Sequence, residues 1–126
     1  LMGEAAAILS TYPIDIIDIN MGCPVRKVIK KGAGAALMKD IRRAETIIRS
    51  VRRRTQLPVT VKFRSGWNNE NRVADHFARM AQDAGANAVT IHARTWAQGF
   101  GGQPDWEMIT KVKKNVTIPV IGNGDI

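Results

Sequence analysis

Ile16-Ile17-Asp18-Ile19-Asn20-Met21-Gly22-Cys23-Pro24 joins an isoleucine-rich run to a glycine, a cysteine and a proline. The run is typical of a strand that is buried on both faces. Gly22 and Pro24 interrupt regular structure, so the strand should end just before Cys23. The only cysteine of the chain would then stand on a stiff turn at the strand's exit, where a thiol can meet a ligand. Taken alone, the stretch favours a quiet buried thiol, because free cysteine is among the most buried residue types.

The same succession of strand, loop and helix recurs three more times along the chain. Strands are predicted at about 14–20, 59–63, 88–92 and 119–122. Helices are predicted at about 2–10, 41–55, 71–84 and 104–114, with a short one at 35–38. Asp40 is expected to cap the helix at 41–55, and Gly85 to end the helix at 71–84. Short apolar strands that alternate with amphipathic helices predict an α/β fold with a parallel sheet covered by helices.

Two architectures fit this succession, a doubly wound open sheet and a partial (β/α)8 TIM barrel of about four βα units. The first unit lacks the Gly-x-Gly-x-x-Gly turn of a dinucleotide-binding sheet. A full barrel needs about 250 residues, so the 126 residues of this chain would make about half of one. Neither Leu1 nor Ile126 resembles a natural terminus, and we expect a piece of a longer protein.

The composition is that of one globular domain, with 44% hydrophobic and 24% charged residues. No apolar run approaches the roughly 20 residues of a membrane span, and no signal peptide precedes the first helix. A single cysteine excludes an internal disulfide and suits the reducing cytoplasm. Histidine, cysteine and clustered carboxylates are too few to support a zinc site, so no metal is expected.

The net charge of +8 favours a polyanionic partner, with nucleic acid as the first candidate. Part of the excess lies in a predicted loop after the first strand, at Arg26, Lys27, Lys30 and Lys31. A solvated basic surface with no partner explains the charge equally well, so charge alone leaves both interpretations open.

Polar side chains follow every predicted strand, as the pairs Asn20 and Cys23, Lys62 and Arg64, His92 and Arg94, and Asn123 and Asp125. In parallel βα folds the carboxyl ends of the strands lie on one side, where ligands bind. Four successive strands that each deliver a polar pair to one rim predict a ligand site there.

Each pair also has a plainer interpretation. The segment Gly122-Asn123-Gly124-Asp125 can hold a phosphate with its backbone N–H groups, or it can be an ordinary turn. Lys62 needs an anion or a strong acceptor, because an unpaired buried ammonium is costly, and Asp18 could supply a structural ion pair. His92 alone is better explained as a core histidine.

Four motifs together resemble the tRNA-dihydrouridine synthases, most of all the bacterial B-type enzymes. They are Asn20-Met21-Gly22-Cys23-Pro24, Lys62-Phe63-Arg64-Ser65-Gly66-Trp67, Ile91-His92-Ala93-Arg94-Thr95 and Asn123-Gly124-Asp125-Ile126. The resemblance covers essentially the whole chain. It implies strands four to seven of an FMN-binding TIM barrel, so residues 1–126 would be a fragment of a catalytic domain that is inactive by itself.

The resemblance also implies a reaction. Members of the family use NADPH to reduce FMN and then reduce a uridine of tRNA to 5,6-dihydrouridine. Hydride passes from the flavin to C6 of the uracil, and a cysteine, which matches Cys23, protonates C5. A neutral thiol is a suitable acid for this step.

The family's flavin contacts match Lys62, His92, Asn123, Gly124 and Asp125, and Asn20 and Arg94 would address the uridine or the flavin edge. Positive charge at Lys62 would stabilise the anionic reduced ring. The uridine would be flipped out of the folded tRNA, with phosphates held by the basic surface. The chain departs from the pattern at Trp96, where a basic residue is expected.

Two other functions stay open on the sequence. A free-pyrimidine or dihydroorotate flavoprotein also carries an Asn-x-x-Cys-Pro loop, although the basic charge and Met21-Gly22 argue against it. A catalytically silent RNA-binding barrel fragment is the other.

Overall fold

The computed structural model describes residues 1–125, so Ile126, the last residue of the fourth motif, lies outside the described residues. The strands are β1 (Ile17–Asn20), β2 (Val59–Arg64), β3 (Ala88–His92) and β4 (Val120–Asn123). The helices are α1 (Met2–Leu9), α2 (Arg26–Ile29), α3 (Ile41–Arg52), α4 (Ala74–Asp83) and α5 (Trp106–Asn115), with a 3-10 helix η1 (Gly34–Lys39). The predicted alternation of strands and helices is confirmed.

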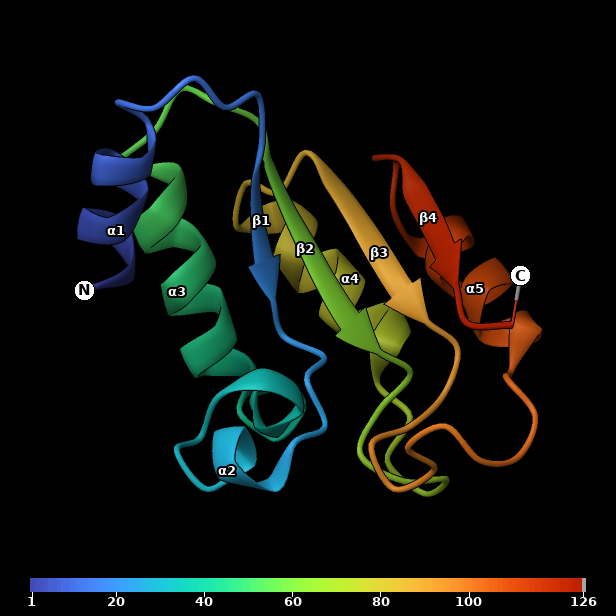
Figure 1. Cartoon of the computed structure of the whole chain (residues 1–126). Coiled ribbons are helices and arrows are strands. Elements are labelled where there is room, and N and C mark those ends of the chain that lie inside the picture. Colours follow the sequence, from blue (N-terminus) through green and yellow to red (C-terminus); the bar gives the residue numbers. More distant parts are fainter. Residues whose placement is uncertain (126) are drawn as a thin grey trace.

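The four strands form one parallel sheet in the order β1-β2-β3-β4. Figure 1 shows the arrows side by side, with their heads toward the edge of the sheet where α2 lies. Helices α1, α3, α4 and α5 contact one another in chain order. Parallel strands in sequential order with helices on one side are the wall of a partial (β/α)8 barrel, so the predicted fold class is confirmed.

The core lies between the sheet and this helical layer. Its strand residues are Ile17, Ile19, Val59, Val61, Phe63, Val89 and Ile91. Phe63 packs on Phe77 of α4 with ring centroids 4.9 Å apart and a tilt of 53°, an arrangement that aromatic pairs favour. Since every second strand residue enters this core, the residues between them form the opposite face of the sheet.

The prediction that the first strand is buried on both faces is wrong. Ile17 and Ile19 are 7% and 5% exposed, but Asp18 and Asn20 are open to solvent. The hydroxyl of Thr60 donates a hydrogen bond to Asp18 Oδ1 across the open face, at 2.6 Å. Within residues 1–125 the helices cover only one face of the sheet, and the other face therefore carries polar side chains.

Element ends follow the predicted caps, with small differences in length. Asp40 accepts a hydrogen bond from the Arg43 backbone N–H at 3.1 Å and caps α3 as expected. Gly85, with φ +106°, directly follows Ala84, the C-cap residue of α4. The first strand begins at Ile17 rather than residue 14, because pairing starts at Val59. Helix α2 lies in the segment predicted as a loop, since a single turn is too short to show periodicity.

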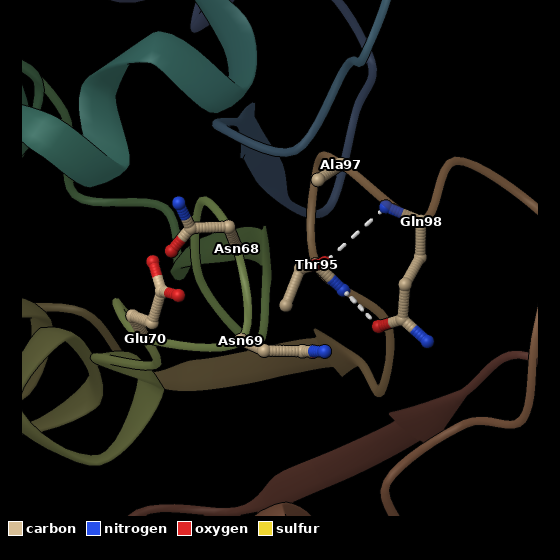
Figure 2. A pocket seen from close by; sticks show the side chains of 6 residues that line it. All are labelled: Asn68, Asn69, Glu70, Thr95, Ala97 and Gln98. Carbon is tan, nitrogen blue, oxygen red and sulfur yellow. Dashed lines mark hydrogen bonds between the residues drawn. The ribbon is translucent and has the colours of Figure 1, made fainter.

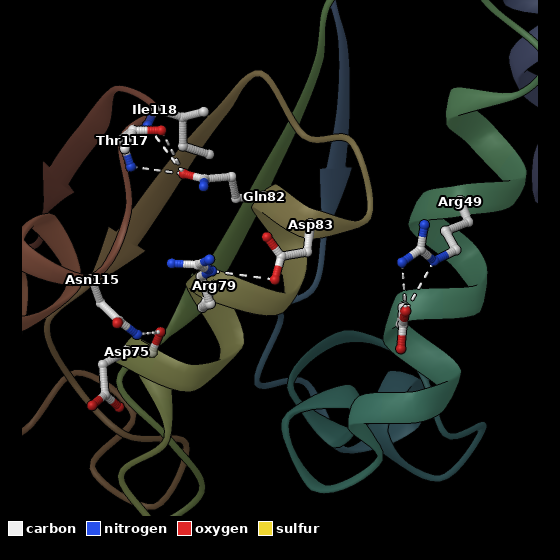
Figure 3. A network of polar contacts seen from close by, with 9 residues as sticks. Arg49, Asp75, Arg79, Gln82, Asp83, Asn115, Thr117 and Ile118 are labelled. Carbon is white, nitrogen blue, oxygen red and sulfur yellow. Dashed lines mark hydrogen bonds and ion pairs between the residues drawn. The ribbon is translucent and has the colours of Figure 1, made fainter.

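Polar contacts hold α5 and the segment that precedes β4 against α4 (Figure 3). The Gln82 side-chain oxygen accepts hydrogen bonds from the backbone N–H groups of Thr117 and Ile118, at 2.7 and 3.2 Å. The Asn115 side-chain amide donates to the Asp75 carbonyl at 2.9 Å. These contacts fix where β4 begins, and therefore where its carboxyl end reaches the rim.

Candidate functional site

The carboxyl ends of the strands surround a pocket of about 280 Å³. It is lined by Asn20, Gly22, Cys23, Pro24, Lys62, Arg64, His92, Phe100 and Asn123. Register places Asn20 beside Lys62, and His92 between Arg64 on one neighbouring strand and Asn123 on the other. Five of the eight residues predicted for the site thus meet in one pocket, while Arg94, Gly124 and Asp125 lie behind its lining.

The turn that carries Cys23 is held by hydrogen bonds from both sides. Asn20 Oδ1 accepts from the backbone N–H groups of Gly22 and Cys23, at 3.0 and 3.1 Å. The Cys23 carbonyl accepts from the Ala35 N–H at 3.0 Å. Cys23 is half-buried and is part of the pocket lining rather than of the core. The interpretation of Cys23 as an unreactive thiol in the core is therefore wrong about its location.

Lys62 lies half-buried on the open face of the sheet. Burial lowers the pKa of Lys62, and the nearby Arg64 lowers it further, against a weaker opposite effect of Asp18. No ion pair joins Lys62 to Asp18 within residues 1–125, since Asp18 instead accepts from Thr60. The ammonium is thus a cation held near the pocket, suited to an anionic ligand.

Arg64 connects the exits of β1 and β3, a role that the sequence did not reveal. Its side chain is 2% exposed. Nε donates to the Gly22 carbonyl at 3.0 Å, and an Nη donates to the carbonyls of Thr95 and Gly99, at 3.1 and 2.7 Å. Burial and then Arg94 lower the pKa of Arg64. The only sign of this role in the sequence was a charged residue at the end of a strand, which does not reveal which carbonyls it binds.

The loop after β3 also borders a second hollow of about 460 Å³ on the same rim, shown in Figure 2. Its lining is polar and comes from the loops after β2 and β3, at Asn68, Asn69, Glu70, Thr95, Ala97 and Gln98. Thr95 and Gln98 bond each other twice, N–H to side-chain oxygen, at 2.9 and 3.3 Å. These two hydrogen bonds keep the loop after β3 compact at the point where Arg64 donates to the Thr95 and Gly99 carbonyls.

His92 is 6% exposed, and its buried Nε2 has no hydrogen-bond partner among the described residues. Burial, followed by Arg64, Lys62 and Arg94, lowers the pKa of His92 to about 4. The imidazole is therefore neutral at pH 7. A Cβ at Gly124 would lie 2.7 Å from the ring, so the glycine lets the loop after β4 close over His92.

We expect His92 to make folding stability depend on pH. In the unfolded chain the pKa returns to about 6.5. Below that pH the unfolded state binds more protons than the folded state. Stability is then complete above about pH 6.5 and falls as the pH decreases toward the folded value of about 4. Urea midpoints of the whole protein that contains this chain, measured at about pH 7.5 and about pH 5, should differ less in His92→Gln than in the wild type.

His76→Gln is the matched control, because His76 is the only other histidine of the chain and lies exposed on α4. A decline that persists unchanged in His92→Gln would contradict the role of His92.

Arg94 is 4% exposed and anchors the loop after β4. Its guanidinium binds both carboxylate oxygens of Asp125, at 2.8 and 2.7 Å, and the carbonyls of Gly101 and Gly102, at 3.1 and 2.8 Å. These bonds raise the pKa of Arg94 and lower the pKa of Asp125. Arg94 thus fixes the segment Asn123-Gly124-Asp125 relative to the glycine-rich loop at Gln98-Gly99-Phe100-Gly101-Gly102.

In residues 1–125 no three His, Cys, Asp or Glu side chains gather as metal ligands. In the same part of the chain no helix has the length and apolar character needed to span a membrane.

Comparison with known proteins places the chain in a family. The model of the dihydrouridine synthase family matches residues 1–126. A probable tRNA-dihydrouridine synthase 1 of Synechocystis is 47% identical over 99% of this chain and 35% of its own length. The tRNA-dihydrouridine synthases B of Vibrio vulnificus and Escherichia coli K12 are each 45% identical, over 100% and 99% of this chain and 39% of their own length. The chain thus spans well under half of these curated relatives. It belongs to the dihydrouridine synthase family.

Proposed function

We propose that the whole protein that contains this chain reduces uridine in tRNA to 5,6-dihydrouridine, with FMN as cofactor and NADPH as the source of electrons. The observation that supports this most is the pocket at the strand ends. It gathers a thiol, an ammonium and a neutral imidazole, on Cys23, Lys62 and His92. The relatives named as tRNA-dihydrouridine synthases supply the substrate class.

The residues present fit a flavin. Lys62 offers a positive charge without an ion-pair partner in the described chain, and His92 offers an unpartnered buried nitrogen. Gly124, which has no Cβ, lets its turn approach the imidazole closely, and this turn can bind a phosphate through backbone N–H groups. Lys62, His92, Asn123 and Gly124 would hold the FMN, while Asp125 would keep the loop in place through Arg94.

When bound and reduced by NADPH, FMN would supply a hydride to C6 of the uracil. The Cys23 thiol donates its proton to C5, so that a C5–H bond forms as the C5=C6 double bond is lost. The resulting thiolate recovers a proton from solvent. The turn held by Asn20 Oδ1 fixes the direction from which this proton arrives.

Asn20 and Arg94 would contribute to uridine binding in different ways, Asn20 by direct contact and Arg94 by positioning a loop. Asn20 uses its side-chain oxygen for the cysteine turn, which leaves its amide N–H groups for a carbonyl of the base. The guanidinium of Arg94 donates its hydrogen bonds to Asp125 and to the glycine-rich loop. It would therefore act on the substrate by positioning that loop.

The basic residues of α2 and the turn after it are positioned to grip tRNA phosphates. Arg26, Lys27 and Lys31 are exposed, and α2 lies at the edge of the sheet toward which the strands point (Figure 1). A uridine in folded tRNA must be extruded before it can enter a pocket, and phosphate contacts steady the flanking chain.

We expect the affinity for tRNA to fall steeply with salt. The double variant Arg26→Gln/Lys27→Gln should reduce the slope of log affinity against log salt by about 1 to 2, because each lost phosphate contact removes about 0.7 to 0.9. Filter binding over a salt series measures it. Lys113→Gln/Lys114→Gln, at the far end of α5, is the matched control. Equal slopes in the two double variants would show that the basic residues of α2 form a solvated surface and do not contact tRNA phosphates.

Nucleoside analysis decides the proposed function. The whole protein is incubated with NADPH and unmodified tRNA, which is then digested and examined by mass spectrometry for uridine that has gained two hydrogens. Parallel reactions contain free uracil or orotate-type pyrimidines. Turnover of the free base with none on tRNA would overturn the proposal in favour of a pyrimidine flavoprotein. Binding of tRNA by a protein without a flavin spectrum would overturn it in favour of a silent RNA-binding module.

A further inference from the structure

Two tryptophans from different loops stack at the back of the cysteine turn. Trp67 follows β2 and Trp96 follows β3, and their rings lie 4.1 Å apart between centroids with an angle of 12°. The indole N–H of Trp96 donates to the Pro24 carbonyl at 3.1 Å. This hydrogen bond reaches the residue directly after Cys23 from a loop 72 positions away in sequence.

The contacts continue from the stack back to the cysteine. Lys39 Nζ lies 4.4 Å from the ring centroid of Trp67, within cation–π range. Lys39 is the last residue of η1, and Ala35 of the same helix donates its N–H to the Cys23 carbonyl at 3.0 Å. Gly34 packs so closely that a Cβ there would lie 2.6 Å from that carbonyl oxygen.

These contacts form a closed path around the turn. It runs from Pro24 to Trp96, on to Trp67 and Lys39, and returns to Cys23 through Ala35 of η1. Asn20 and Arg64 hold the residues before the thiol, at the Cys23 N–H and the Gly22 carbonyl. The closed path of contacts holds Pro24, the residue after Cys23, in place. Because proline fixes its own φ, a bond to the Pro24 carbonyl also restricts the orientation of Cys23.

We propose that Trp96 is a positioning residue for Cys23, which it holds in place through the hydrogen bond to Pro24 and through its stack on Trp67. The role in the reaction rests on the proposed function, in which the thiol must reach C5 of the uracil. The hold on the cysteine turn does not rest on it. A purely structural tryptophan pair would contribute to stability without any effect on the exposure of the thiol.

Three tryptophan-to-phenylalanine substitutions separate these roles, since the chain has three tryptophans. Trp96→Phe keeps an aromatic ring against Trp67 but removes the N–H. Trp67→Phe keeps both the stack and the N–H of Trp96. Trp106→Phe alters the first residue of α5, which is 44% exposed, and serves as the control. Within residues 1–125, the indoles of Trp67 and Trp106 donate no hydrogen bond, so only Trp96→Phe removes one.

The first measurement is the rate at which iodoacetamide alkylates Cys23 in the whole protein, followed on its peptide by mass spectrometry. Loss of one hydrogen bond should raise this rate about five-fold in Trp96→Phe, with Trp67→Phe and Trp106→Phe close to the wild type. Thermal melting of each variant confirms that it is folded. Should Trp96→Phe not fold, Trp96→His, which retains a ring N–H, is compared with Trp96→Leu, and the rate should rise only in the leucine variant.

The second measurement is the steady-state reduction of tRNA. Trp96→Phe should lower kcat about five-fold with the KM for tRNA unchanged, because the proton donor is displaced and the binding surface is not. If the wild type reduces no tRNA, the proposed function fails, while the alkylation rates still decide whether Trp96 holds the turn. Equal alkylation rates in the three phenylalanine variants and the wild type would overturn this inference, whatever the activity.

Discussion

Cys23→Ala is expected to lower the rate of tRNA uridine reduction by about 10²- to 10⁴-fold, the usual contribution of a positioned general acid. The turn itself should survive, because its hydrogen bonds use the Asn20 side chain and the backbone of residues 22–24 rather than the thiol. The protein should therefore retain its yellow flavin. Single-turnover formation of dihydrouridine and the flavin absorbance are the two measurements.

Cys23→Ser is the matched comparison. The hydroxyl has nearly the size of the thiol but is a far weaker acid, so its rate should stay close to that of the alanine variant. A wild-type rate in Cys23→Ala would remove the thiol from the mechanism. Loss of flavin together with activity would show instead that Cys23 supports the cofactor site.

Lys62→Met is expected to weaken flavin retention about 10- to 100-fold, since a hydrogen bond from a charged donor is worth roughly 1.5 to 3 kcal/mol. Methionine keeps most of the length of the side chain and removes its charge. Dialysis of the whole protein followed by fluorescence of the released flavin measures the affinity. Lys113→Met, on the exposed end of α5, is the control.

The pH dependence of this affinity gives an independent check on Lys62. Burial and Arg64 lower the pKa of Lys62 from its ordinary value. As the pH rises, the ammonium should therefore lose its proton, and the flavin its counter-charge, below the ordinary lysine value of about 10.4. The affinity of the wild type should fall over that range, and the affinity of Lys62→Met should not. Parallel curves for the two proteins would exclude Lys62 from flavin binding.

The sequence predicted the architecture because the signals of parallel βα folds are local. Apolar runs, an aspartate at Asp40 and a glycine at Gly85 mark where elements begin and end, and parallel order then brings the strand ends to one edge. For the same reason the sequence alone predicts that one rim carries Asn20, Cys23, Lys62, His92 and Asn123, which line one pocket. The roles of these residues in binding and catalysis stay predictions.

The sequence did not predict the burial or the hydrogen-bond partners of residues whose environment is formed by distant parts of the chain. Asp18 was expected in a strand buried on both faces, but the helices cover a single face in the described residues, and it is exposed. The contacts of Arg64 and Trp96 join loops 31 to 72 positions apart, and no pattern along the chain encodes such distances. Charge and aromaticity identify a donor, and only the fold identifies its acceptor.

The cations around the pocket have a consequence for the abundance of the protein. Burial lowers the pKa values of Lys62 and Arg64, and the neighbouring guanidinium, Arg64 for Lys62 and Arg94 for Arg64, lowers each further. The burial of these cations costs free energy, to which their repulsion adds, and the anionic ligand of the proposed function would offset part of that cost. A ligand present at 100 times its dissociation constant adds about 2.7 kcal/mol to the stability of the folded state. Under the proposed function, in which this ligand is the flavin, the amount of the whole protein that a cell maintains should follow the supply of flavin, and starvation for flavin should deplete the protein.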